Sequence, residues 1–267
     1  MILGNYDKEL KEMTWSFSRV NGFGQCKYYW YLNYLEKREK EDNVYSLFGK
    51  FGHKILEMYA NDELTKKEMV FYYKEYFKDE VSDKMVDISE EKIQKYYELG
   101  LSYFENCDLV LTGYDILGVE LECHYDIDGI SFIGFIDLLL RDKETGDIFI
   151  IDHKSSEFPL GKKGGILKKK EKDYMDYKRQ LYLYAQPVYD MYGVYPKEIQ
   201  WNYFKERKWL KLPFVLEEFE EAKKWAIDTI KVIYEEDEFI QTEDYFYCRN
   251  LCNFRGSCEY RKLKGGD

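Results

Sequence analysis

The sequence lacks the features that would mark a membrane or exported protein. No apolar run approaches the roughly 18 residues that a membrane helix needs, and the N-terminus has no charged-then-apolar leader. The chain also has no internal repeat and no Gly-x4-Gly-Lys-Ser/Thr motif, which a nucleotide-driven helicase would carry. We therefore expect a cytoplasmic protein without a membrane partner, which does not unwind nucleic acid by itself.

An excess of positive charge is absent as well. The formal net charge is −11, which by itself argues against a nucleic-acid partner. Affinity for phosphate, however, depends on where the charges lie rather than on their sum. One basic cluster stands out along the chain, and it consists of Lys162, Lys163, Lys168, Lys169, Lys170 and Lys172. DNA therefore remains a possible partner, and five residues of this cluster are the predicted contacts, namely Lys162, Lys163, Lys168, Lys169 and Lys170.

The first part of the chain has helical character. Of the 267 residues, 45% are apolar, which is enough to bury one large core. Apolar residues recur at helical spacing in four segments, about 14–35, 49–61, 65–78 and 89–106. Thr65 and Glu68 have the spacing of a capping box at the start of the third segment. The pattern predicts a helical region over about residues 1–110.

Strand-like segments follow. Three segments alternate or run apolar, at 116–126, 130–141 and 147–154. A Lys/Gly-rich loop at 155–172 precedes a predicted helix at 173–192, a strand at 197–205 and a helix at 216–236. This order predicts an α/β protein with a central mixed sheet flanked by helices.

Two apolar runs end in acidic residues. One run ends in Asp152-His153-Lys154, and another ends in Gly134-Phe-Ile-Asp137. Because side chains alternate along a strand, Asp152 and Lys154 should project from one face and His153 from the other. Two acids and a lysine can hold a divalent cation beside a cationic group, as phosphodiester hydrolysis requires. Lys154 could position or deprotonate water, or stabilise charge on the phosphorane.

Further polar residues fit such a site. His53 lies on a predicted helix, and a neutral imidazole is a ligand that favours Mn²⁺ over Mg²⁺. Gln180 and Tyr184 lie four residues apart on one predicted helix face. Each has an ordinary explanation alone, as a surface or capping histidine, a solvated amide and a packing phenol. Their joint occurrence in this order favours a metal-dependent nuclease.

This order of motifs resembles the PD-(D/E)XK nucleases of the RecB type, over about residues 14–260. The resemblance implies a restriction-endonuclease-like core and Mn²⁺ or Mg²⁺ as cofactor. The metal ligands that it implies are His53, Asp137, Asp152 and the backbone carbonyl of His153, with Lys154, Gln180 and Tyr184 as catalytic residues. Glu120 stands where such proteins often carry an acid, although Glu122 competes with it. His153 replaces the more usual Tyr or Phe.

Six cysteines occur, and we expect no disulfides among them in a cytosolic chain. Cys248, Cys252 and Cys258 form a Cys-x3-Cys-x5-Cys group in the tail. Sulfur ligands so close together suit zinc or an iron–sulfur cluster, provided that a fourth ligand joins them. Cys107 and Cys123 fit buried structural thiols.

The segment around Cys26 resembles the N-terminal cysteine region of iron–sulfur members of this nuclease family, which include AddB-type and CRISPR-adaptation enzymes. By that likeness Cys26, Cys248, Cys252 and Cys258 hold a [4Fe–4S] cluster, with zinc as the alternative. The family spacing in the tail is usually x2 then x5, whereas this chain has x3 first. The cluster would join the ends of the chain around a helical region (1–110), a nuclease core (111–240) and a cysteine tail (241–267).

Three functional hypotheses follow. The first is a metal-dependent exonuclease acting on DNA ends, preferably single-stranded, in recombination, repair or phage DNA processing beside a separate helicase or recombination partner. A variant of it is a CRISPR-adaptation nuclease that trims spacer precursors. The second is a non-catalytic iron–sulfur DNA-binding module, against which the complete set of acids, histidine and lysine argues. The third is a redox protein, which would transfer electrons and cleave nothing.

Overall fold

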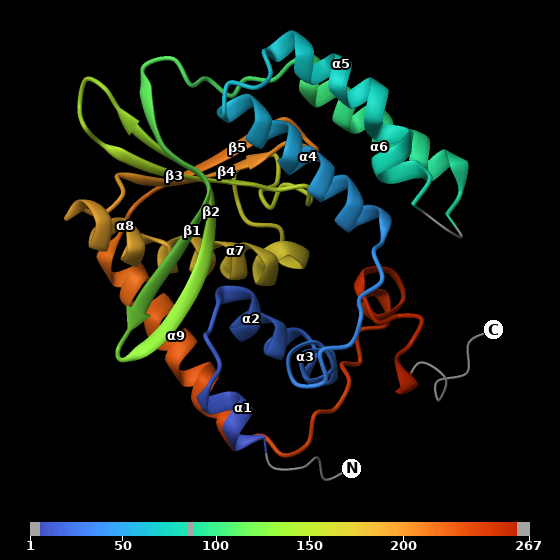
Figure 1. The fold of residues 1–267 in the computed structure, drawn as a ribbon, viewed down its shortest axis with the longest axis vertical. Helices are drawn as coiled ribbons and strands as arrows, with labels where there is room; N and C mark the ends of the chain where they lie inside the picture. The colour runs from blue at the N-terminus through green and yellow to red at the C-terminus, as the bar shows by residue number, and fades with distance from the viewer. Residues whose placement is uncertain (1–5, 85–87, 261–267) are drawn as a thin grey trace. The chain divides into compact units, whose positions relative to one another are not determined.

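The structure, a computed structural model, describes residues 6–84 and 88–260. Contacts divide the described chain into two compact units (Figure 1). The first contains residues 6–43, 126–133 and 220–260, and the second contains 44–84, 88–125 and 134–219. The three-part division predicted from the sequence, with boundaries near 110 and 240, stays a prediction. Within the described residues, no helix is both long and apolar enough to cross a membrane.

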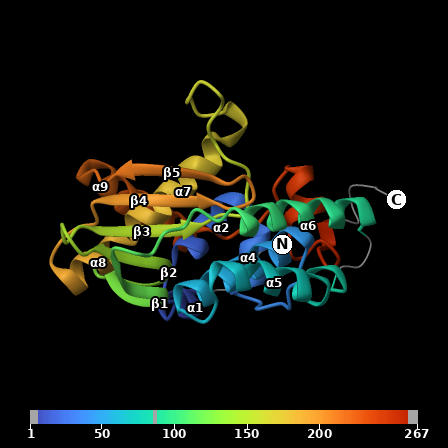
Figure 2. The same ribbon diagram turned by 90° about the horizontal axis from the view of Figure 1, so that it is seen from above.

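A five-stranded mixed sheet is the centre of the fold, with the order β1-β2-β3-β4-β5 (Figure 2). The strands are β1 (Tyr114–Ile127), β2 (Ile130–Asp142), β3 (Ile148–His153), β4 (Glu198–Tyr203) and β5 (Lys208–Pro213). β3 pairs antiparallel with β2 and parallel with β4, and β5 returns antiparallel to β4. The predicted α/β class with a mixed sheet is therefore confirmed. β5 was not predicted, because residues 208–213 do not alternate regularly between polar and apolar types.

The parallel pairing of β3 and β4 requires a long crossover, because the chain must return to the starting end of β3 before β4 begins. It is made by η2 (Lys168–Lys170), α7 (Glu171–Leu183) and α8 (Ala185–Tyr192). The sequence predicts one helix over this stretch, whereas the structure has two. Pro187 explains the break, since it lacks an N–H and its ring conflicts with the carbonyl of Leu183 in a continuous helix.

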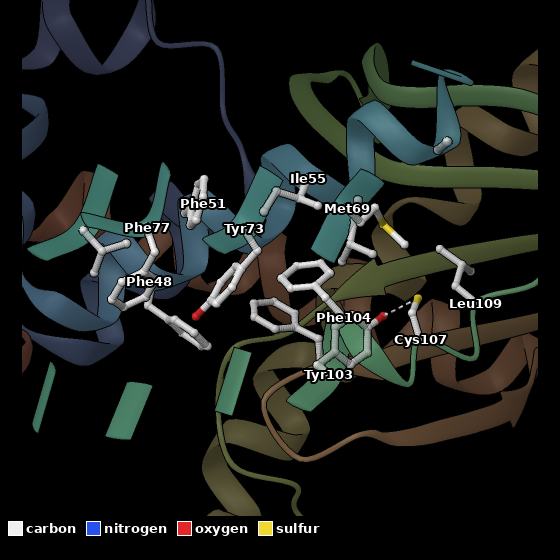
Figure 3. Packing of buried hydrophobic residues seen from close by; sticks show 14 of the residues in the cluster. Phe48, Phe51, Ile55, Met69, Tyr73, Phe77, Tyr103, Phe104, Cys107 and Leu109 are labelled. Atoms are coloured by element: carbon white, nitrogen blue, oxygen red, sulfur yellow. Dashed lines mark hydrogen bonds between the residues drawn. The ribbon is translucent and has the colours of Figure 1, made fainter. Parts of the chain in front are cut away.

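Three helices form one layer over a face of the sheet. They are α4 (Val44–Ala60), α5 (Lys66–Phe77) and α6 (Glu90–Glu105), with the short π-helix η1 (Lys78–Ser82) after α5. Thr65 and Glu68 form the predicted capping box of α5. Leu138, Leu140 and Ile151 of the sheet join the aromatic core of these helices. Figure 3 shows Phe51, Tyr73 and Phe77 together in this core, where Phe51 stacks on Tyr73 and Phe77 is tilted against it.

The first unit is built around aromatic stacking. Its elements are α1 (Asp7–Lys11), α2 (Phe17–Gln25), α3 (Lys27–Tyr34), most of α9 (Leu216–Glu235) and the π-helix η3 (Tyr247–Leu251). Ser16 caps α2 by accepting the N–H of Arg19, as its place before the helix suggests. Trp30 is fully buried and stacks on Phe239, which joins α3 to the segment after α9. The N-terminal helices thus pack against the C-terminal tail within one unit.

Candidate active site

Asp137 and Asp152 meet on adjacent strands. In the antiparallel register of β2 and β3, Leu138 pairs with Ile151, so the next step brings Asp137 opposite Asp152. Directly opposed residues share a face of the sheet with Cβ atoms about 5 Å apart. Burial, and then the charge of Asp152, raise the pKa of Asp137 to about 7. A metal-free site therefore concentrates negative charge that a cation would neutralise.

His53 reaches this pair from α4. Its Nδ1 lies 3.4 Å from Asp137 Oδ2 and 3.8 Å from Glu120 Oε1. Burial would lower the pKa of His53, but Asp137 and Glu120 outweigh it, so the pKa is raised. Gly52 precedes His53 on the helix, and a Cβ there would lie 2.6 Å from the Phe204 ring. The glycine thus lets α4 approach the end of β4 closely enough to deliver the imidazole.

A bend in β1 separates Glu120 from Glu122. In a regular strand these residues would share a face, but Glu120 has φ = +44°, in the left-handed region. Glu120 points to His53, whereas Glu122 is more exposed and pairs with His124 at 2.8 Å. Strain of this kind in a non-glycine residue is typical of functional sites. Of the two glutamates, Glu120 is thus the one that lies beside His53.

Lys154 lies beside the acids with a nearly buried side chain. Its Nζ is 2.7 Å from Asp152 Oδ2 and donates a hydrogen bond of 3.0 Å to Gln180 Oε1. Burial alone would lower the pKa of Lys154, but the Asp152 carboxylate more than compensates, so the pKa is raised. The side chain is therefore an ammonium ion at neutral pH, and it is not poised to accept a proton.

Gln180 and Tyr184 complete this side of the site from α7. The Gln180 amide donates to the Tyr184 hydroxyl at 3.3 Å, and burial raises the pKa of Tyr184 to about 12. The Tyr184 ring packs against Gly134, where a Cβ would approach it to 2.6 Å. Gly134, in the same motif as Asp137, thus makes room for the helix that holds Lys154.

His153 follows the predicted alternation. Its side chain is buried, with Nδ1 3.2 Å from Asn202 Nδ2, while its ring stands edge-on to that of His53. Its backbone N–H donates to Asp137 Oδ2 at 2.6 Å. Burial lowers the pKa of His153 well below the usual value, so the ring is neutral. The proposed metal contact of its carbonyl stays a prediction.

The residues fit a divalent cation. One ligand atom each from His53, Glu120 and Asp137 lies within 4.8 Å of the others, and this is the sole such group among the described residues. One imidazole with carboxylates suits Mn²⁺ or Mg²⁺ better than a soft metal. Asp152 lies close enough to Asp137 for its charge to act on that carboxyl group. Lys154 supplies a positive charge next to Asp152.

A second candidate site lies in the first unit. The four predicted sulfur ligands, Cys26, Cys248, Cys252 and Cys258, line one cavity of about 160 Å³. The backbone N–H groups of Tyr29 and Thr242 both donate to Cys26 Sγ. Burial, and then the other three sulfurs, raise the pKa of Cys252 to about 12. Cys107 and Cys123 are buried in the other unit, as expected for structural thiols.

The lysine-rich loop forms a small hairpin. Leu160 bridges to Ile166, and the N–H of Leu167 donates to the carbonyl of Pro159. The segment projects beyond β5 in Figure 2. Four of the five lysines predicted to bind DNA are exposed, namely Lys162, Lys163, Lys168 and Lys169. Lys170 is more buried and pairs with Glu157 and Asp173.

The family model of the PD-(D/E)XK nuclease superfamily matches residues 14–259 of this chain. The match spans both units and every residue of the site described above. The chain belongs to the PD-(D/E)XK nuclease superfamily. Nucleases of this superfamily use divalent metal ions, which agrees with the group formed by His53, Glu120 and Asp137.

The fold of this PD-(D/E)XK nuclease is also similar to solved structures. One is the crystal structure of an exonuclease candidate from Eubacterium rectale, with a TM-score of 0.53 and 13% sequence identity. The similarity covers 100% of this chain and 95% of that one. No curated protein matches the sequence. At this identity the structural likeness supports the shared fold alone.

Two residues of this PD-(D/E)XK nuclease face the site without having been predicted. Glu57 lies one turn after His53, and its pKa is raised first by burial and then by Glu120. Tyr177 lies one turn before Gln180, and its ring centroid is 4.4 Å from Lys154 Nζ. Both could have been predicted from the sequence, because residues three or four apart share a helix face, and Glu57 and Tyr177 have this spacing from His53 and Gln180.

Proposed function

We propose that this chain is a metal-dependent DNA exonuclease that hydrolyses phosphodiester bonds at DNA ends, preferably single-stranded, with Mn²⁺ or Mg²⁺. The group of His53, Glu120 and Asp137 beside the Asp152–Lys154 pair is the observation that carries the proposal. A bound divalent cation there would neutralise the scissile phosphate and lower the pKa of the attacking water. Action at DNA ends is part of the proposal, which we extend to this chain from the description of the similarly folded exonuclease candidate from Eubacterium rectale.

The acids and the histidine would hold the cation. Asp137 and Asp152 face each other across two strands, and Glu120 and His53 approach from β1 and α4. The N–H of His153 fixes one oxygen of Asp137, so that carboxylate cannot rotate freely. Ligands that are fixed on strands and a helix favour one binding geometry over others.

Lys154 would act as a cation toward the reacting phosphate. Its raised pKa argues against a role as general base, which the sequence left open. Held by Asp152 and Gln180, the ammonium group can orient the nucleophilic water and stabilise charge that develops on the phosphate oxygens. Gln180 and Tyr184 serve this role indirectly, because they anchor Lys154 to α7.

The hairpin lysines would bind the DNA backbone. Lys162, Lys163, Lys168 and Lys169 are exposed on a segment that starts five residues after Lys154 and ends at α7, with Lys170 at its base. Contacts of this kind are electrostatic and independent of sequence, so affinity should fall steeply as salt rises.

A [4Fe–4S] cluster is our proposal for Cys26, Cys248, Cys252 and Cys258. Around one zinc ion, sulfurs at about 2.3 Å from the metal lie about 3.8 Å apart. No three of these sulfurs lie within 4.8 Å of one another, although all four line the same cavity. This spacing favours a polyatomic cluster over a single zinc.

Anaerobic purification followed by nuclease assays tests the proposal. We expect a brown protein that digests single strands labelled at either end, with Mn²⁺ or Mg²⁺ present and no digestion in chelator. Lys154→Ala should abolish cleavage and retain DNA binding, whereas Lys67→Ala, an exposed lysine on α5, should cleave normally. Unchanged cleavage by the Lys154 variant would contradict the mechanism. DNA binding without cleavage by the wild-type protein would favour a non-catalytic module, and colourless protein with stoichiometric zinc would overturn the cluster.

A further inference from the structure

The ammonium group of Lys154 is enclosed from three directions. Asp152 Oδ2 lies 2.7 Å from Nζ, Gln180 Oε1 lies at 3.0 Å, and the Tyr177 ring centroid lies at 4.4 Å. The first contact is an ion pair, and the second is a hydrogen bond donated by the ammonium group. The third places the electron-rich face of an aromatic ring against the same charge, well within the roughly 6 Å over which cation–π attraction acts.

Tyr177 belongs to the same helical stripe as the residues that anchor Lys154. Positions 177, 180 and 184 of α7 are spaced by three and four residues, so their side chains leave the helix on one face. The stripe thus extends one turn toward the N-terminus of α7. Because one rigid helix carries all three residues, they approach Lys154 with a fixed relative geometry.

We propose that Tyr177 is a positioning residue for the reaction, which acts by holding the Lys154 ammonium group through its aromatic face. The inference rests on the proposed nuclease function. With Asp152 alone as a strong partner, the flexible lysine could follow that carboxylate into several rotamers. The ring, 4.4 Å from Nζ, adds a third contact that restricts these rotamers. A fixed ammonium group stabilises charge on the phosphate without reorganising during the reaction.

A direct contact of Tyr177 with DNA is the competing role. The side chain is half-buried, so part of its ring is open to a base that could stack on it. The two roles differ in what they change. A base-stacking residue contributes to DNA binding, so its loss raises KM. A residue that positions Lys154 contributes in the transition state, so its loss lowers kcat.

Three variants separate these roles in the full-length holoprotein. Tyr177→Phe keeps the aromatic face, Tyr177→Leu keeps apolar bulk without it, and Tyr174→Leu is a matched control one turn earlier on α7. For steady-state digestion of single-stranded DNA with Mn²⁺, we expect Tyr177→Leu to lower kcat about five- to thirtyfold with KM unchanged. Tyr177→Phe should stay within about twofold of the wild type, and the Tyr174 variant should behave as the wild type does.

Other outcomes would overturn the inference. A raised KM with unchanged kcat in Tyr177→Leu would assign the ring to DNA, and equal loss in the Phe and Leu variants would assign the effect to the hydroxyl. If the wild-type protein cleaves no nucleic acid, the proposed function fails, and the ring contact is then tested by thermal unfolding. Tyr177→Leu should lower Tm less in a Lys154→Met background than in the wild type. Equal losses in the two backgrounds would show that the ring does not hold the ammonium group.

Discussion

At the scale of single residues, the carboxylates of Asp137 and Asp152 repel each other in the metal-free site, and a bound cation would offset this repulsion. Asp137 and Asp152 lie opposite each other on adjacent strands, and both side chains are largely buried. Lys154 and His53 offset part of the charge, yet the pKa of Asp137 is still raised to about 7. A carboxylate whose pKa is raised by folding makes the folded state less stable at a pH above that value.

Asp137→Asn should therefore stabilise the metal-free protein at pH 8. The amide oxygen can still accept the N–H of His153, while the repulsion with Asp152 disappears. We expect a gain in unfolding free energy of about 2 kcal/mol at pH 8. The stabilising effect of protonated Asp137 is present near pH 4 and is lost as pH rises through about 7, so the gain should shrink toward pH 5.

Chemical denaturation of the two proteins in chelator, at several pH values, measures this difference. Mn²⁺ should then reverse the order, because it stabilises the wild type by binding the folded state and stabilises the variant far less. A difference that stays constant from pH 5 to pH 8 would show that Asp137 does not titrate in this range.

Glu120 and Glu122 offer a matched pair for testing metal binding. Glu120 lies in the ligand group with His53, whereas Glu122 pairs with His124 on the exposed side of β1. We expect Glu120→Gln to weaken Mn²⁺ binding at least about tenfold, an effect typical of removing a metal-site group. Glu122→Gln should leave it unchanged. Isothermal titration with Mn²⁺ distinguishes them, and equal effects would contradict the assignment of Glu120.

The side-chain periodicity of strands and helices made it possible to predict from the sequence which residues would lie together at the site. Alternation along β3 correctly separated Asp152 and Lys154 from His153, and helix spacing brought Gln180 and Tyr184 together. The strained φ of Glu120 could not be read, because it breaks the regular alternation that such predictions assume. The ring contact of Tyr177 depends on how α7 lies on the sheet, which no local pattern specifies.

At the scale of elements, the contact between β2 and α7 helps to set the position of Lys154. Gly134 allows the Tyr184 ring to pack directly on the strand backbone, and Tyr184 and Gln180 in turn lead to Lys154. The glycine of the Gly-x-x-Asp motif therefore acts on Lys154 through α7, a helix that follows β3 in the sequence. This coupling between elements is testable.

Gly134→Ala should reduce both stability and activity. The new Cβ would lie 2.6 Å from Tyr184 Cε1, so α7 or the ring must shift. Overpacking of this kind costs about 1–3 kcal/mol, and displacement of Gln180 should lower kcat at least about tenfold. Gly24→Ala is the control, because no atom lies within 4 Å of its Cβ and alanine favours the helix α2. Thermal unfolding and the cleavage assay measure both effects, and wild-type kcat in Gly134→Ala would contradict the coupling.

The elements themselves were largely predictable. Periodicity and turn residues located α4, α5, α6 and the first four strands. The three helices and β1 have a buried and an exposed side, whereas β3 and β4 are buried at nearly every residue. β5 escaped prediction because its residues do not alternate regularly and it lies on the edge of the sheet, with three of its six residues exposed. The break between α7 and α8 escaped as well, although Pro187 marks it.

At the scale of the whole molecule, the two units carry different chemistry. All the metal-site residues and Lys154 lie in the unit formed by 44–125 and 134–219, and the four clustered cysteines lie in the other. The latter unit is discontinuous, since it joins both ends of the chain and the tip of the β1–β2 hairpin. Cys26 and Cys258 come from opposite ends of the sequence, so a cluster would link them and restrict the unfolded chain.

Removal of one cluster ligand should therefore loosen one unit selectively. We expect Cys252→Ser to lose the iron–sulfur absorbance and to lower the hydrogen-exchange protection of α2, α3 and residues 220–260. Protection of α4, α6 and β3 should change little, because their aromatic core and sheet do not involve the cluster. Cys123→Ala is the control, since it removes a buried thiol from β1 in the other unit. Hydrogen exchange followed by mass spectrometry resolves the two units peptide by peptide. If protection fell equally in both, the cluster would stabilise the nuclease core as well, and folding of the active site would depend on iron.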